Sequence, residues 1–158
     1  MYTMCAAILV VSKEFLAFLP NIELVSFLLI VYALHFRLVG VIGIAFLFSS
    51  IQTMLYGIGI WTPMYFIVWT FLGVITYYIK SFLNNENRCS LYSGGFGLIF
   101  GFLFSIPYFI VSSRLGWIYF LKGIPFDLIH AIANYLIMLV LFQKVNQIIY
   151  TLARKYNL

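Results

Sequence analysis

"GIPFDLIHAIANYLIMLVLF", residues 123–142, is long and apolar enough to cross a bilayer as a helix. Three polar residues, Asp127, His130 and Asn134, stand inside it three and four positions apart. On a helix this spacing places the three side chains on one face. An ionisable group costs free energy in lipid and therefore usually faces a protein interior or a cavity. The stretch predicts a membrane helix with an inward polar stripe.

The three polar side chains have two interpretations. Taken singly, Asp127 in the first turn suits the positive end of the helix dipole, His130 suits a bond to a neighbouring helix, and Asn134 suits interhelical bonding. Taken together, beside a connection rich in aromatics, they favour one wall of a cavity that opens outward.

The composition of the whole chain supports a membrane protein. Of its 158 residues, 65% are hydrophobic and only 8% are charged, and the mean hydropathy is +1.08. This is far outside the range of soluble domains and predicts an all-α integral membrane protein. The net charge of +5 is dispersed between apolar segments. We interpret it as a topology signal and expect no nucleic-acid partner.

We expect a single domain, residues 1–158, that forms a six-transmembrane-helix bundle. The expected helices are 2–19, 23–36, 38–56, 63–82, 91–111 and 125–150. The first lacks a basic leader region and a small-residue cleavage site, so it is expected to stay as a helix. With both termini cytoplasmic, six basic residues lie inside and two outside: Arg37, Lys80, Arg88, Lys144, Arg154 and Lys155 against Arg114 and Lys122. This bias predicts a multi-pass protein of the cell membrane.

Other polar residues fall near the expected outer surface. Lys13 and Glu14 are adjacent, so they point about 100° apart and are not expected simply to pair with each other. Either one of them faces the same cavity, or both find bundle partners, such as Lys13 with Asp127. Gln52 and Tyr56 share a helix face, four positions apart.

The expected outer connections have a distinctive composition. They are "FLPNIEL" (18–24), "YGIGIWTPMY" (56–65) and "VSSRLGWIYFLKGIPF" (111–126). Proline, glycine and aromatic residues build shaped loops and contact surfaces, although an interfacial aromatic belt explains single aromatics as well. Glu23 in the first connection could cap the next helix or touch a ligand.

Chemical motifs are missing from the sequence. It has no nucleophile elbow, no zinc-protease motif and no phosphate-binding glycine loop. Cys5 and Cys89 have no motif spacing, and two histidines exclude a histidine-rich metal site. We therefore expect no enzyme, no metal and no cofactor, and any active transport must take its energy from a partner.

In the order of its features, the whole chain resembles the substrate-binding membrane subunit, or S component, of energy-coupling factor (ECF) vitamin transporters. The likeness is carried by "FLAFLPNIELVSFLLIVYAL" (15–34), "GVIGIAFLFSSIQTMLYGIG" (40–59), "SGGFGLIFGFLFSIPYF" (93–109) and "GIPFDLIHAIANYLIMLVLFQKV" (123–145). The last is similar to the family's final helix, which carries a polar, a basic and an asparagine residue on one face.

The resemblance implies a function and a site. A vitamin-like substrate would be bound near the outer face under a lid, and the subunit would dock on a membrane scaffold (T) subunit with two ATP-binding subunits. The family's lid, loops and last helix correspond to Asn21, Glu23, Tyr56, Trp61, Tyr65, Arg114, Trp117, Lys122, Asp127, His130 and Asn134. We add Lys13, Glu14 and Gln52 as candidate pocket residues. The small residues for docking correspond to Thr3, Ala6 and Ala7.

Two other functions remain open at this point. One is a membrane-embedded enzyme that uses Asp127 and His130 as an acid–base pair. The other is a structural or regulatory membrane subunit without a ligand, in which the polar stripe only holds helices together. The sequence does not identify which vitamin or precursor an S component of this kind would bind.

Overall fold

The computed structural model describes all 158 residues, and it is all-helical, without strands. Its six helices are α1 (Tyr2–Phe15), α2 (Val25–His35), α3 (Leu38–Tyr56), α4 (Thr62–Ile79), α5 (Glu86–Val111) and α6 (Ser113–Tyr156). Four of them, α3 to α6, are long and apolar enough to cross a membrane. The helix count and the length of these four helices indicate a membrane protein.

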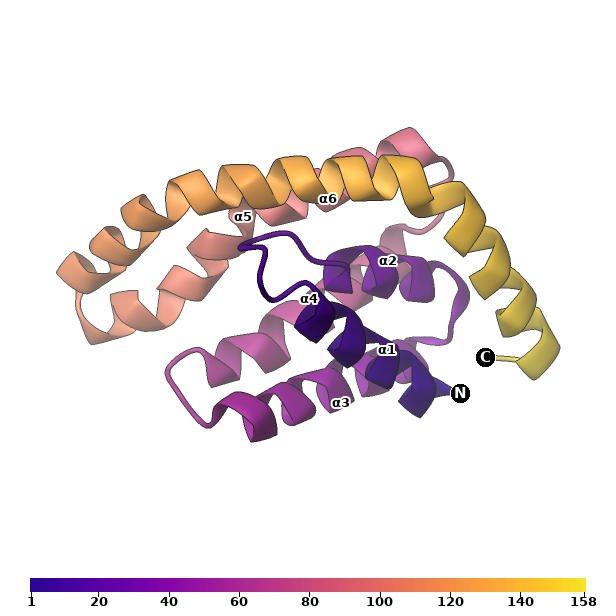
Figure 1. Cartoon of the computed structure of the whole chain (residues 1–158), viewed down its shortest axis with the longest axis horizontal. Helices are drawn as coiled ribbons and strands as arrows, with labels where there is room; N and C mark the ends of the chain where they lie inside the picture. The colour runs from indigo at the N-terminus through magenta and orange to yellow at the C-terminus, as the bar shows by residue number, and fades with distance from the viewer.

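The helices form a hairpin and a smaller group beside it (Figure 1). The antiparallel pair α5 and α6 runs along one side, and α3 and α4 lie on the other, with α1 packed against α3. The short helix α2 contacts both α4 and α6, and eight of its eleven residues are buried. In Figure 1 both termini lie at the right, while the α3–α4 loop and the α5–α6 turn lie at the left.

Helix α1 is shorter than predicted. It ends at Phe15, whereas the sequence predicted a helix to residue 19. The backbone N–H of Leu19 bonds the carbonyl of Leu16, so the chain tightens into turns there. Pro20 disfavours the helical conformation at Leu19, so the chain does not resume the helix after these turns. With 14 residues, α1 is about 21 Å long, less than the hydrocarbon core of about 30 Å.

Helix α6 differs most from the prediction. It begins at Ser113, whereas the sequence predicted a loop up to residue 124. Only Ser112, in an extended conformation, separates α5 from α6. Pro125 lies inside α6, because neighbouring helices support a membrane helix that lacks one backbone hydrogen bond. The stacked rings of Tyr108 and Tyr119, 4.2 Å apart, hold the added turns against α5.

Other boundaries differ by one to six residues, whereas α3 has the range that was expected. Helix α4 ends at Ile79, three residues early, where a turn bonds the N–H of Phe82 to the Ile79 carbonyl. Helix α5 begins at Glu86, five residues early. The side chain of Asn85 explains this start, because it caps the helix by accepting the backbone N–H of Arg88 at 3.0 Å.

Large apolar side chains are exposed around the molecule. Examples from four helices are Phe15, Met54, Ile110 and Val140, each more than half exposed. A soluble monomer rarely exposes so much contiguous apolar surface, whereas lipid solvates it. The exposed surface therefore agrees with the hydropathy of the helices.

Helices α5 and α6 approach closely at a glycine. A Cβ atom on Gly97 would lie 2.8 Å from the backbone carbon of His130 and from the backbone nitrogen of Ala131. Small residues allow membrane helices to pack at this distance. Gly97 therefore fixes how α5 meets the polar stripe of α6.

Candidate ligand-binding site

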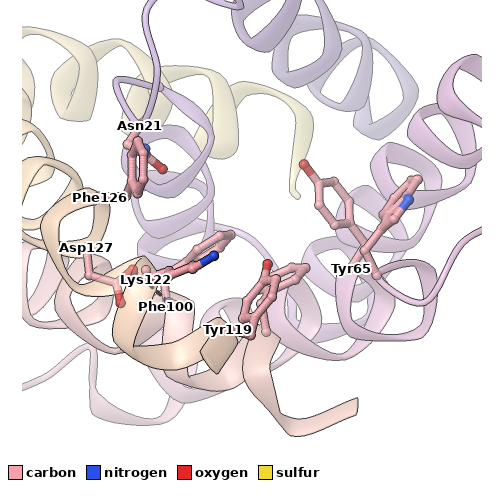
Figure 2. A pocket seen from close by; sticks show the side chains of 11 residues that line it. Asn21, Tyr65, Phe100, Tyr119, Lys122, Phe126 and Asp127 are labelled. Atoms are coloured by element: carbon pink, nitrogen blue, oxygen red, sulfur yellow. Dashed lines mark hydrogen bonds between the residues drawn. The ribbon is translucent and has the colours of Figure 1, made fainter. Parts of the chain in front are cut away.

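A cavity of about 460 Å³ lies between the hairpin and the helix pair α3–α4. Chain segments far apart in sequence meet around it: Asn21 from the α1–α2 loop, Trp61 from the α3–α4 loop, and Tyr119 near the α5–α6 turn. Figure 2 shows Tyr65 on one side and Asn21, Phe126 and Asp127 on the other. The volume lies in the range of small-molecule sites.

Most of the cavity wall is aromatic, and its polar groups are few. The aromatic side chains are Trp61, Tyr65, Phe100, Phe104, Tyr119 and Phe126. The polar side chains are Asn21, Lys122 and Asp127. An apolar pocket with a few convergent polar groups is the usual form of a binding site for a ring-bearing molecule.

Asp127 is held in the cavity wall by the backbone of α5. Its Oδ1 accepts the backbone N–H of Gly101 at 2.9 Å, and the residue is only 6% exposed. No protein donor bonds its Oδ2. A Cβ atom on Gly101 would lie 2.3 Å from that oxygen, so glycine leaves the space that the carboxylate occupies.

A smaller chamber of about 210 Å³ adjoins the cavity and shares Trp61 and Tyr65 with it. Beside it the Glu14 carboxylate accepts from Gln52 Nε2 at 3.1 Å and from the Tyr56 hydroxyl at 2.5 Å. Lys13 Nζ lies 3.2 Å from Glu14 Oε1.

The Lys13–Glu14 contact corrects the prediction that these neighbours do not pair. Their long flexible side chains reach around the helix to each other, which the direction of the Cα–Cβ bonds alone does not capture. Lys13 has its partner within α1, and no ion pair joins it to Asp127.

Glu23 and His130 bind each other and fasten the α1–α2 loop to α6. His130 Nε2 lies 3.1 Å from Glu23 Oε1, and both Glu23 oxygens accept the backbone N–H of Ser26 in the first turn of α2. Burial raises the pKa of Glu23, but the bonds from His130 and Ser26 and the charge of His130 outweigh it, so the pKa is lowered. The loop is thereby held beside the cavity, where its Asn21, with φ 60°, lines the wall.

This contact predicts an acid-sensitive fold. Because the folded-state pKa of Glu23 is lowered, the ionised carboxylate contributes stability above its ordinary pKa of 4.5, and that stability is lost as pH falls through the lowered value. Thermal unfolding in detergent from about pH 7 to about pH 3 measures it. We expect the melting temperature of Glu23→Gln to lie below that of the wild type at neutral pH and to converge with it in acid. A constant gap across the range would contradict this role.

Asn134 is fully buried without a hydrogen-bond partner for either amide atom. It shares the inward face with Asp127 and His130 but does not line the cavity. Interhelical bonding through Asn134, one of the two interpretations of the stripe, therefore has no partner in this structure.

We predict that removing the Asn134 amide stabilises the protein. An unsatisfied buried polar group costs about 1–3 kcal/mol, so Asn134→Leu is expected to raise the free energy of unfolding by about 1 kcal/mol. Reversible unfolding in mixed detergent measures the change. A loss of stability would mean that ordered water satisfies the amide in the native protein.

The cavity brings together five of the residues proposed from sequence and leaves others outside. Asn21, Trp61, Tyr65, Lys122 and Asp127 line it. Lys13, Gln52 and Tyr56 line the smaller chamber, and Glu14 bonds to all three. Trp117 instead packs on Phe109 and Phe120 near the hairpin turn and is 54% exposed. Arg114, also near that turn, is exposed and lines neither space.

The three candidate docking residues on α1 differ in exposure. Thr3 and Ala7 are exposed, whereas Ala6 is buried at 1% exposure and is covered by the chain itself. Any partner on this face of α1 would therefore contact Thr3 and Ala7 and not Ala6.

Several cavity residues were not identified from the sequence. Tyr119 lies in a segment for which the sequence predicts a loop, so its helical register was not predictable, and Phe126 lies in the first turn of the predicted helix 125–150 without a polar group to single it out. Phe100, Gly101 and Phe104 come from α5, an apolar helix without charged residues at this level. The four-residue spacing of Gly97 and Gly101 was a usable signal for close helix packing.

Comparison with protein-family models, with curated proteins and with solved structures finds no match. The functional conclusion therefore depends on the geometry of the site and on the resemblance drawn from the sequence.

Proposed function

We propose that this chain is the substrate-binding membrane subunit of an ECF-type importer that captures a vitamin or related micronutrient. The observation that carries the proposal is the cavity of about 460 Å³, to which the α1–α2 loop, the α3–α4 loop and the α5–α6 hairpin all contribute. A purely structural bundle has no need for such a space beside a buried carboxylate. The cavity is lined by Trp61 of the α3–α4 loop and by Tyr119 near the α5–α6 turn. In Figure 1 this loop and this turn lie at the end away from the termini, which faces outward in the topology proposed below.

The proposed topology has six membrane-embedded helices and both termini in the cytoplasm of a bacterial cell. Support comes from the basic residues of the α2–α3 connection, of the α4–α5 connection with the first turn of α5, and of the C-terminal part of α6: Arg37, Lys80, Arg88, Lys144, Arg154 and Lys155. Cytoplasmic segments of membrane proteins have this excess. Helices α1 and α2 are short, and α2 is shielded from lipid by its neighbours, so neither has to span the full bilayer alone.

The α1–α2 loop is proposed to act as the lid. It meets the cavity through Asn21, and it is fastened by the Glu23–His130 contact at 3.1 Å. A ligand that touches Asn21 stabilises the closed position by its differential affinity for that state. The loaded subunit then docks on a membrane scaffold subunit with two ATP-binding subunits, and the exposed Thr3 and Ala7 offer a small-residue surface for close helix approach.

Asp127 and His130 have different partners, the Gly101 backbone and Glu23, and only Asp127 lines the cavity. An acid–base pair for catalysis would need both groups within reach of one bound substrate. The proposal is therefore binding and transport without turnover.

Uptake tests this function. The chain is expressed with a scaffold subunit and two ATP-binding subunits in a host that needs one vitamin and cannot import it. We expect growth at low vitamin concentration only with all components. Inactivating the ATP-binding subunits should stop uptake but leave vitamin binding by this chain unchanged. Chemical conversion of the vitamin by this chain alone, or uptake independent of the ATP-binding subunits, would contradict the proposal.

A further inference from the structure

We infer that the ligand of the cavity is a dipolar organic cation: a planar nitrogen heterocycle whose positive nitrogen lies at Asp127 and whose acidic substituent faces Lys122. The inference depends on the proposed binding function and names the substrate class of that same site. It follows from two opposite charges in one cavity that have no partner in the protein.

Asp127 is the first of these charges. Its carboxylate is buried, and the only bond it accepts comes from the Gly101 backbone at 2.9 Å. The charged contacts of the chain are Lys13–Glu14 and Glu23–His130, so no basic side chain lies within ion-pair distance of Asp127. A buried charge without a counter-charge is unfavourable, and a cation that enters the cavity supplies the missing partner.

The aromatic walls favour a flat cation over a compact one. Phe100 and Phe104 stack with centroids 4.6 Å apart, and Tyr65 meets Phe104 edge to face at 5.8 Å. Ring faces attract a delocalised positive charge through their quadrupole and also stack on a planar ring. A heterocyclic cation gains from both interactions and from Asp127, whereas a metal ion or a small ammonium has no ring that could stack on the aromatic side chains.

Lys122 is the second unpaired charge. It lines the same cavity as Asp127 but forms no ion pair with it or with any other carboxylate. The two residues are five positions apart on α6, which directs their side chains about 140° apart around the helix axis. A ligand with only a positive charge would be repelled by Lys122, whereas an acidic group on the opposite side of the ring turns this repulsion into a bond.

Four probes that share a pyridine ring distinguish the effect of a positive charge on the ligand from that of a negative charge. Nicotinamide is neutral, 1-methylnicotinamide is a cation, nicotinate is an anion, and 1-methylnicotinate carries both charges. Binding of each to the purified full chain is measured by isothermal titration in detergent. We expect N-methylation to tighten binding about tenfold or more, and the carboxylate to tighten it further over the amide.

Variants assign each preference to its residue. Asp127→Asn should abolish the preference for N-methylated probes, and Lys122→Gln should abolish only the preference for the carboxylate. Lys155→Gln, at the distant end of α6, is the matched control and should change neither. If Asp127→Asn does not fold, Lys122→Gln still tests the inference, because Lys122 is exposed.

Equal binding of neutral and charged probes, or no binding by any of the four, would overturn the inference. So would a preference for N-methylated probes that survives Asp127→Asn. None of these results affects vitamin uptake with the partner subunits. The inferred substrate class can therefore be wrong while the proposed function is right. Failure to import any vitamin would contradict the proposed function itself.

Discussion

Replacing Gly97 with alanine is expected to lower the free energy of unfolding by about 1–3 kcal/mol, the usual cost of overpacking. The added Cβ would lie 2.8 Å from the backbone of His130 and Ala131. Backbone atoms cannot rotate out of the way as a side chain can, so α5 and α6 must separate. Separation loosens packing along the whole hairpin, including the turns that hold Phe100 and Asp127 at the cavity.

Gly95→Ala is the matched control, two residues away on the same helix. A Cβ at Gly95 meets nothing within 4 Å, so the change adds a methyl group without a clash. Alanine also favours a helix over glycine by about 1 kcal/mol, so this variant should be at least as stable as the wild type. Reversible unfolding in mixed detergent compares the two. Equal stability of Gly97→Ala and Gly95→Ala would show that the two helices do not pack as closely as described.

Gly101→Ala is expected to weaken ligand binding about 10- to 100-fold, by the loss of one charge-assisted contact of about 1.5–3 kcal/mol. Its Cβ would lie 2.3 Å from Asp127 Oδ2. Unlike the backbone opposite Gly97, a carboxylate can swing aside, so the fold survives. In the structure the Asp127 carboxylate accepts the Gly101 N–H and faces the cavity. In Gly101→Ala it has to leave this position.

Equilibrium binding of the ligand that the chain retains most tightly measures this effect. Gly95→Ala again serves as control and should bind like the wild type. This variant tests the position of the Asp127 carboxylate and not its charge, because Asp127 itself is unchanged in Gly101→Ala. Unaltered binding by a well-folded Gly101→Ala protein would place the ligand away from Asp127.

The polar stripe illustrates what a sequence of this kind predicts well. The spacing of Asp127, His130 and Asn134 required one inward face, and all three side chains are buried, with exposures of 6%, 2% and 0%. Hydropathy likewise located the apolar centre of each helix, because the cost of exposing a segment to water follows from the apolar area of its own side chains. What each polar group would bond was not predictable, since the partners Gly101 and Glu23 come from other segments.

Helix α6 shows where local signals fail. Glycine and proline between residues 112 and 125 are the ordinary marks of a loop. Here Gly116 instead lets the Phe109 ring pack against the backbone of α6, where a Cβ would lie 2.3 Å from it. Tertiary contacts of this kind override local preference, and they bring Tyr119 and Phe126 into the cavity. The aromatic wall of the cavity was therefore not predictable from the sequence and is defined only by the three-dimensional structure.

One measurement tests the central claim, that the cavity is a high-affinity site for a small molecule. The purified chain, in detergent and without ATP, is heated with each member of a panel of vitamins and their precursors. A bound ligand stabilises the fold in proportion to the logarithm of its concentration over Kd, so one compound should raise the melting temperature clearly. The account predicts one such hit, strongly reduced in Gly101→Ala and kept in Gly95→Ala. A well-folded protein that no compound stabilises, or a hit indifferent to Gly101→Ala, would contradict it.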